Sequence, residues 1–314
     1  MGSSKSVVLT ALVANGAIAI MKFVGWLLTG SPSMLSETYH SISDTGNQVF
    51  LLIGIRFGAK EANQLHPFGY GKAQFFYSFL VSVLLFGIAG WESAKHGYEK
   101  LVHGGHGGAA ADVTVLGQTF DPIYVNYAVL LGGIVFESWA FVKANAELRE
   151  QMDENDWSGY REAFRRTSDV TTLTAFTEDT IALAGLVLAL LGNLAGQLTG
   201  NEIYDAAAAF LIGIMLMGFA VALAWENKRL LLGESLHESE EAPLRQLIEE
   251  SDGVEEIVEF RSVYFGPERV LVTADVAFAE GIGTEAMDET ISDIEAQIQD
   301  AQPFVKKVYI EPET

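Results

Sequence analysis

The hydrophobic positions of this chain fall into long blocks rather than into alternating patterns. Each of six blocks is long enough to supply the about 20 helical residues that cross a bilayer. The blocks predict spans at residues 7–29, 33–57, 73–95, 123–147, 169–195 and 204–232. We therefore expect an α-helical membrane protein with six transmembrane helices. We expect no cleavable signal peptide, because Val7 begins a full-length span and no small-residue cleavage site precedes a soluble domain.

After the sixth block the pattern becomes that of a soluble domain. Pro243 is predicted to open a helix, because apolar residues follow it at helical spacing. Two strands, a second amphipathic helix and a third strand are then expected at 254–263, 270–278, 287–298 and 304–310. The order αββαβ predicts a small α+β, ferredoxin-like cytoplasmic domain. The expected boundaries are 1–233 for the transmembrane domain and 234–314 for this second domain. Because about 80 residues are close to the lower limit for an independent core, we expect a homodimer.

The positions of the basic residues predict the orientation in the membrane. If the N-terminus is cytoplasmic, only Lys95 and Lys100 fall outside, so both termini are expected in the cytoplasm of a multi-pass cell-membrane protein. Eleven basic residues then lie inside: Lys5, Arg56, Lys60, Lys72, Lys143, Arg149, Arg161, Arg165, Arg166, Lys228 and Arg229.

The composition restricts both the partners and the ligands. Residues 234–314 carry 21 acidic and 5 basic side chains, which argues against nucleic acid as a partner. We interpret this acidity as a solvated surface, and the alternative is a funnel that attracts metal. The chain has no cysteine, so a metal must be held by His, Asp, Glu, Asn or backbone oxygen.

Titratable side chains inside two predicted spans point to a metal site. The second span carries Glu37, His40 and Asp44 near one helical stripe, and the fifth carries Glu178 and Asp179. Adjacent helical residues point about 100° apart, so only one of the acidic pair can face the second span squarely. Polar residues in membranes can also be interhelical hydrogen-bonding glue. Four carboxylates beside one imidazole would repel one another without a cation, which favours a transporter's metal site.

Other classes of function receive less support. No glycine-rich phosphate loop follows a strand, and no nucleophile–base pair stands in the soluble domain, so we expect no enzyme and no prosthetic cofactor. A membrane metal sensor or scaffold that recruits partners through its acidic domain stays open. Metal flux distinguishes the two, since a sensor binds metal without moving it.

Three stretches together resemble the cation diffusion facilitator family of metal–proton antiporters. They are the segment Gly30-Ser-Pro-Ser-Met-Leu-Ser-Glu-Thr-Tyr-His-Ser-Ile-Ser-Asp44, the segment His66-Pro-Phe-Gly-Tyr-Gly-Lys72, and the acidic pair of the fifth span. The pattern is most similar to the zinc transporter nine-like branch. The resemblance covers the whole length and implies six spans, a cytoplasmic αββαβ domain and efflux of divalent metal by alternating access.

The resemblance also implies a metal site of four side chains, two on the second span and two on the fifth. His40, Asp44 and Asp179 match three of these positions, whereas the fourth is Ala175, which cannot ligate. Glu178, Glu37 or water is left to complete the set. A protonated imidazole cannot bind metal, so protons would compete at His40. Zn²⁺/H⁺ antiport is the first expectation, and one imidazole with carboxylates makes Mn²⁺ or Fe²⁺ export the alternative.

Further metal positions of the family are incomplete in this chain. His66 matches a cytoplasmic ligand, but Asn63 and Tyr70 stand where others are usual, so we interpret His66-Pro67 as loop architecture. In the soluble domain only Glu311 keeps a ligand atom, and the other positions are Val258, Ala274 and Tyr309. We expect dimerisation without an interfacial zinc pair. The outer tract of His96, His103 and His106 is interpreted as a flexible linker rather than a loose metal site.

Overall fold

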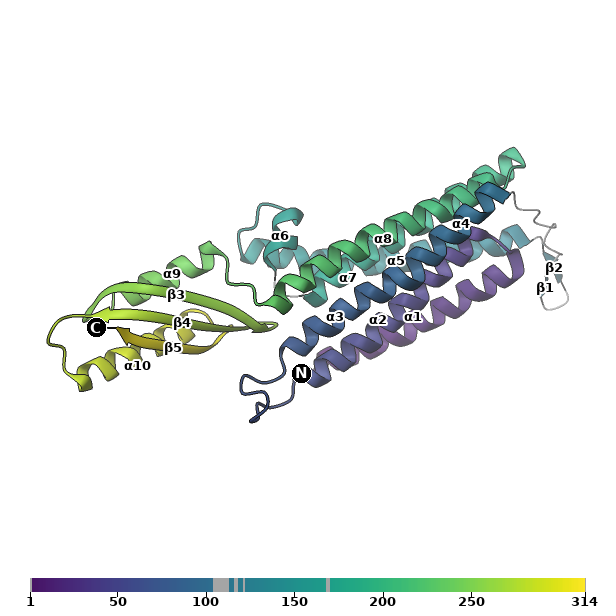
Figure 1. Ribbon diagram of the computed structural model, residues 1–314. Helices are drawn as coiled ribbons and strands as arrows, with labels where there is room; N and C mark the ends of the chain where they lie inside the picture. The colour runs from purple at the N-terminus through teal and green to yellow at the C-terminus, as the bar shows by residue number, and fades with distance from the viewer. Residues whose placement is uncertain (1, 104–112, 116–117, 121, 168–169, 314) are drawn as a thin grey trace. The chain divides into compact units, whose positions relative to one another are not determined.

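The computed structural model describes residues 2–103, 113–115, 118–120, 122–167 and 170–313. Helices occupy each block that the hydrophobic pattern predicts to be a span, and Figure 1 shows them side by side as a bundle. They are α1 (Gly2–Thr29), α2 (Pro32–Gly58), α3 (Lys72–Leu84), α4 (Trp91–His103), α5 (Pro122–Glu154), α7 (Val170–Thr199) and α8 (Ile203–Leu232). Together these helices form a helical membrane domain.

Four of these helical segments are long and apolar enough to cross a membrane. They are Lys72–His103, Ile123–Glu154, Thr172–Thr199 and Ile203–Leu232. The apolar part of α1 within the residues searched is shorter, at Asn15–Thr29, and α2 with its polar stripe is not among the four.

Glycine and proline separate the first two helices as the sequence pattern predicts. Gly30 has φ 66° and donates its N–H to the Trp26 carbonyl, which closes the last turn of α1. Pro32 is the first residue of α2, where its missing N–H has no helical partner to lose. The two helices therefore reverse direction over a very short connection.

The third span contains a π-helical turn, η1 (Leu85–Gly90), between α3 and α4. Beyond this turn, α4 lies against α8 with backbone in contact with backbone. A Cβ placed on Gly97 would collide with the backbone of Phe210, and one placed on Gly213 would collide with the backbone of Ala94. Small residues thus allow these two helices to approach closely.

The chain forms two compact units, residues 1–54 with 77–226 and residues 55–76 with 227–314. The core of the first unit is built from apolar side chains of α2, α3, α5, α7 and α8. Its fully buried members include Met34, Val81, Leu130, Leu186, Ile212, Leu216 and Leu223.

The second unit contains the elements α9 (Glu238–Glu249), β3 (Val254–Gly266), β4 (Arg269–Phe278), α10 (Thr284–Ala301) and β5 (Val305–Glu313). This confirms the predicted order αββαβ. Strand β4 lies in the middle of the sheet, antiparallel to β3 and parallel to β5. Helix α9 packs on β3, α10 packs on β5, and the two helices contact each other, so they cover the same face. The buried side of β4 is Val270, Val272, Ala274 and Val276.

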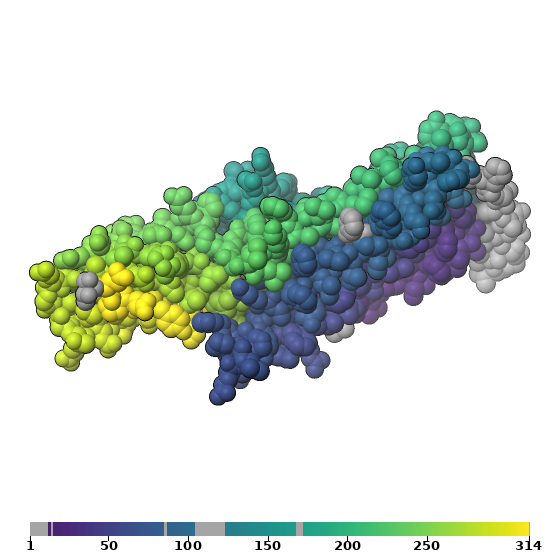
Figure 2. All heavy atoms as spheres, viewed as in Figure 1, coloured from purple at the N-terminus to yellow at the C-terminus, as the bar shows by residue number. Residues whose placement is uncertain are grey.

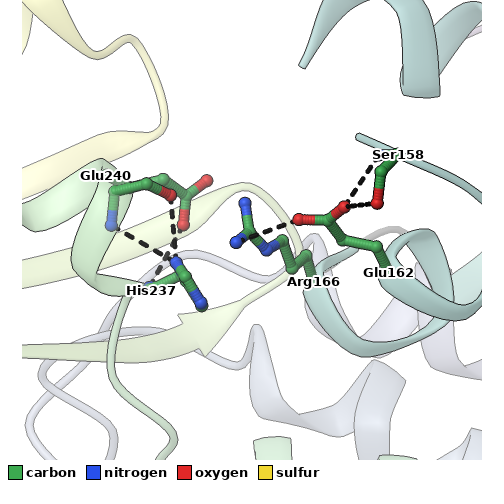
Figure 3. A network of polar contacts seen from close by, with 6 residues as sticks. Ser158, Glu162, Arg166, His237 and Glu240 are labelled. Atoms are coloured by element: carbon green, nitrogen blue, oxygen red, sulfur yellow. Dashed lines mark hydrogen bonds and ion pairs between the residues drawn. The ribbon is translucent and has the colours of Figure 1, made fainter. Parts of the chain in front are cut away.

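The predicted start of the first helix in this unit is wrong. Helix α9 begins at Glu238, so Pro243 lies inside it. The His237 side chain accepts a hydrogen bond from the Ser239 N–H, and the Glu240 carboxylate accepts one from the His237 N–H at 3.2 Å (Figure 3). These capping contacts pair N–H groups of the first turn and fix the start of the helix before the proline is reached.

Two short elements on the connections were not predicted. Strands β1 (Val113–Val115) and β2 (Gln118–Phe120) pair antiparallel between α4 and α5. Helix α6 (Tyr160–Arg166) lies between α5 and α7. In α6, Glu162 accepts hydrogen bonds from the backbone and hydroxyl of Ser158 and pairs with Arg166 at 3.0 Å (Figure 3).

The connection between α2 and α3 packs on the turn between β3 and β4, within the second unit. Gly71 leaves no room for a side chain, since its Cβ would lie 2.5 Å from the Phe265 carbonyl oxygen. The Phe68 and Phe265 rings have centroids 6.3 Å apart, and the Arg269 guanidinium lies 5.0 Å from the Phe265 ring. In the space-filling view this connection, dark blue, stands at the surface (Figure 2).

His66, the histidine of this connection, is held by contacts with other residues of the same connection. The His66 ring stacks on the Tyr70 ring at 4.1 Å, and Asn63 accepts the His66 N–H at 2.9 Å. Asn63 also donates to the Tyr70 hydroxyl at 2.8 Å. These contacts agree with the interpretation of His66-Pro67 as loop architecture.

Candidate metal site in the helix bundle

Helices α2 and α7 lie side by side and run antiparallel. Near the start of α2, Ser33 accepts a hydrogen bond from Asn193, in the second half of α7, at 3.0 Å. Toward the end of α2, Asn47 donates to the carboxylate of Glu178, in the first half of α7. The order of the two contacts is thus reversed between the helices, and their separation along the sequence is nearly the same on both. This pairing puts Asp44, one turn before Asn47, near the level of Asp179.

His40 and Asp44 lie together on α2, as the i, i+4 spacing predicts. His40 Nε2 is 3.5 Å from Asp44 Oδ2, and both side chains are buried. Both ring nitrogens of His40 and the second oxygen of Asp44 are buried without a hydrogen-bond partner in the described part of the chain. Buried polar atoms are nearly always hydrogen-bonded, so these atoms are suited to binding a ligand.

The acidic pair of α7 faces the same region but is not gathered around His40. Glu178 is held by the Asn47 amide, and the charges of Glu178 and Asp179 both act on Asp44. Glu137 of α5 is buried and adds a further negative charge near Asp44. Among the described residues, no group of three or more His, Asp or Glu side chains lies close enough to hold a metal ion. The structure therefore brings together the predicted ligand pair of α2, and leaves the α7 carboxylates apart from it.

Glu37 has a partner that the sequence analysis did not identify. Lys22 of α1 lies 2.9 Å from Glu37 Oε2, and both side chains are fully buried. The signal was present, because Lys22 is a lysine between Met21 and Phe23 in an apolar block. A charged group in such a block usually faces a partner or a pathway.

A second buried polar cluster joins four helices around Asp205. The Asp205 carboxylate of α8 accepts hydrogen bonds from Ser31, at 2.8 Å, and from Ser33 of α2. It also accepts one from Asn193 of α7 at 2.7 Å, and Asn126 of α5 donates to Asn193. This cluster could not be predicted from the sequence, because its members are single polar residues that are far apart along the chain.

The positions in the soluble domain where the family has an interfacial zinc pair differ in their exposure. Val258 and Tyr309 are each 49% exposed, whereas Ala274 is buried in the sheet. Glu311 lies opposite Asp275 in the register of β5 and β4. Of the outer histidines, His103 donates through Nδ1 to the Glu99 carbonyl at 3.2 Å, and His106 lies outside the described residues.

Comparison with known proteins decides the family. The sequence profile named cation efflux transmembrane domain matches residues 8–232, which is well over half of the chain. The chain belongs to the cation efflux family. This is a family of transporters, so the prediction that the chain is not an enzyme is confirmed, as is the predicted resemblance.

Relatives of this cation efflux protein include the human mitochondrial proton-coupled zinc antiporter SLC30A9. It is 28% identical over 296 residues, which are 94% of this chain and 50% of the relative. Metal tolerance protein C4 of Arabidopsis thaliana is 25% identical over 275 residues, which are 88% of this chain and 57% of the relative. The chain thus spans about half the length of these relatives. A nickel form of the MamM C-terminal domain covers 25% of this chain and 98% of its own, at 14% identity and a TM-score of 0.24.

Proposed function

We propose that this cation efflux protein moves divalent metal out of the cytoplasm in exchange for protons, with Zn²⁺ as the first substrate. The carrying observation is the pair His40 and Asp44, which are buried together on α2 and have ligand atoms without a hydrogen-bond partner among the described residues. The names of the relatives support zinc and protons as substrates.

The proposed ligands are His40, Asp44 and Asp179, completed by Glu178 or water. Like charges repel, and a cation bound to His40 and Asp44 would offset the repulsion between Asp44 and Asp179. We expect Asp179 to move toward the α2 pair on binding, which would give Zn²⁺ the four ligands that it prefers. Glu178 must exchange its contact with Asn47 for the metal if it is the fourth ligand.

Proton coupling follows from the chemistry of these ligands. The imidazole of His40 binds metal only when it is neutral, and a carboxylate binds only when it is ionised. Metal release on the side with more protons is therefore favoured. An inward flow of protons would drive metal outward as the helices rock between inward-open and outward-open states.

The membrane arrangement belongs to the same proposal. We propose six spans with both termini in the cytoplasm of the cell membrane, supported by the distribution of basic residues and by the helices at all predicted positions. The homodimer remains a prediction. Light scattering of the detergent-solubilised protein, corrected for bound detergent, would give its mass.

A flux assay in proteoliposomes tests the proposal. Vesicles with an acidic lumen and a zinc-sensitive dye should accumulate external zinc, and a protonophore should abolish the accumulation. The variants Asp44→Ala and Asp179→Ala should lose it, whereas the control Glu150→Gln, which removes an exposed carboxylate from α5, should keep it. Equal flux through the two alanine variants and the parent would refute the site. Zinc binding without any flux would indicate the sensor.

The identity of the metal is tested by competition in the same vesicles. Manganese, ferrous iron, cobalt and cadmium compete with zinc for entry. We expect each of these ions to reduce zinc entry only weakly. If manganese or ferrous iron displaces zinc more effectively than the other ions do, the export of that ion replaces zinc in the proposal.

A further inference from the structure

We propose that Lys22 is a specificity-determining positioning residue of the transport site. It binds Glu37 and so keeps this carboxylate out of the shell of oxygen ligands around the metal. The inference rests on the proposed function and concerns the selectivity between zinc and manganese.

The position of Glu37 on α2 would make it a further candidate ligand if its side chain were not restrained. It precedes His40 by three residues and therefore lies one helical turn away on the same stripe of α2. Its carboxylate is nevertheless turned to α1, where Lys22 Nζ lies 2.9 Å from Oε2. Breaking a fully buried ion pair leaves two uncompensated charges, so this contact holds the side chain strongly.

The other side of Glu37 is blocked by α7. A Cβ on Gly185 would lie 2.5 Å from Glu37 Oε1, so the carboxylate rests against the helix backbone at a glycine. Glu37 Oε1 has no hydrogen-bond partner among the described residues. The carboxylate is thus wedged between a lysine and a glycine, and one of its two oxygens keeps the capacity to bind a cation.

Lys22 differs from the other cationic side chains in its burial. Where the structure describes burial, it is the only lysine or arginine that is buried. Lysines lose much conformational freedom and hydration on burial, so a buried lysine needs a specific partner. Glu37 is that partner, while the charges of Glu137 and Asp44 also act on Lys22.

The chemistry of the two metals gives the restraint a consequence. Zinc is satisfied by four ligands including imidazole, whereas manganese prefers more ligands and favours oxygen. Releasing Glu37 would add one or two oxygens next to His40 and Asp44. Lys22 therefore favours zinc by limiting the oxygen ligands.

The experiment measures zinc and manganese binding by titration calorimetry on the purified full chain, together with flux of each metal in vesicles. Lys22→Met should raise the manganese-to-zinc affinity ratio by about tenfold, since one more carboxylate is free to bind. Lys22→Arg should stay close to the parent. In Lys22→Met with Glu37→Gln, which removes the charged pair but keeps the volumes, the ratio should return to that of the parent.

The double variant decides between the possible causes. If it keeps the raised ratio of Lys22→Met, the lysine acts through its charge alone and the proposal is wrong. An unchanged ratio in folded Lys22→Met also overturns it. Should Lys22→Met fail to fold, the double variant is compared with the parent. A loss of zinc affinity in the double variant would show that Glu37 is a ligand, which contradicts the proposal. Retained affinity and selectivity would support it. Failure of the proposed function is seen separately, as a parent that binds zinc but moves no metal.

Discussion

Asp44 and Asp205 are both buried aspartates of the helix bundle, and they differ in the donors that surround them. Asp205 receives hydrogen bonds from Ser31, Ser33 and Asn193, which are uncharged. Asp44 has one oxygen near His40 and the other without any partner in the described part of the chain. The charges that act on Asp44 are mostly negative.

The difference indicates which buried carboxylate can bind a cation. The donors around Asp205 already take the place of water, so this carboxylate connects helices and needs no further ligand. Asp44 is left with an unpaired acceptor, and an unpaired buried acceptor is costly unless a ligand or a proton satisfies it. Burial alone therefore does not indicate a metal site, whereas an unpaired oxygen on a buried carboxylate beside an imidazole supports the proposed one.

The largest expected effect is on zinc affinity. Asp44→Asn keeps the shape of the side chain and removes its charge, so zinc affinity should fall by roughly 100-fold, the factor given by about 3 kcal/mol for one charge-assisted contact. Asp205→Asn should leave zinc affinity near that of the parent. Titration calorimetry in detergent measures both. Equal losses in the two variants would remove the distinction between the clusters.

The next effect is on stability, where the loss should be larger for a variant at Asp205 than for a variant at Asp44. Asp205→Ala removes the acceptor of three hydrogen bonds, from Ser31, Ser33 and Asn193, at about 1 kcal/mol or more for each. We expect a loss of roughly 3 kcal/mol, measured as a lower denaturation temperature by tryptophan fluorescence. Zinc at 100 times the Kd of the parent should stabilise the parent and Asp205→Asn by about 2.7 kcal/mol, but Asp44→Asn by only about 0.4 kcal/mol. Equal stabilisation of all three proteins by zinc would contradict the assignment.

A smaller effect is expected where α7 touches Glu37. Gly185→Ala places a methyl group against Glu37 Oε1 and should destabilise the protein by about 1–3 kcal/mol through overpacking. Gly132→Ala is the matched control, since no atom lies within 4 Å of the added Cβ. It should be neutral or stabilising by about 0.5–1 kcal/mol. Thermal denaturation compares the two, and a harmless Gly185→Ala would mean that Glu37 can move freely.

The smallest effect concerns the contact between Asn47 and Glu178. Asn47→Ala removes the donor that holds Glu178, and we expect a loss of about 1 kcal/mol in stability. Gln197→Ala, which removes an exposed hydrogen bond from Tyr127, should change stability by less. Chemical denaturation followed by fluorescence would rank them. An equal effect of both would show that the Asn47 contact is no stronger than a surface one.

Sequence could predict the features that depend on local spacing. His40 and Asp44 are four residues apart on one helix, so helical periodicity alone brings them together. The order of helices and strands after residue 234 also follows from local periods. Pro243 was misleading, because its preference for a first turn was outweighed by the capping contacts of His237 and Glu240.

The features that depend on contacts between helices could not be predicted in the same way. The Asp205 cluster joins residues that are far apart along the chain, and each of its members alone looks like ordinary interhelical glue. Lys22 was visible in the sequence as a charge in an apolar block, but its pairing with Glu37 depends on how α1 packs against α2. The same holds for the number of ligands that α7 is proposed to supply, since it would depend on side-chain movement toward the metal.

The π-helical turn η1 sets the rotational phase of the third span. A π turn contains one residue more than an α turn, so it rotates everything after it by about 100° relative to an uninterrupted α-helix. Gly97 and Ala94, which lie beyond η1, meet α8 only with that rotation in place. Deleting one residue from 85–90 would restore a regular α-helix and keep Gly97 and Ala94 on the face that meets α8, because the π turn already takes up the rotation of one residue. The contact of the third span with α8 thus depends on η1, at a point where the sequence is merely apolar.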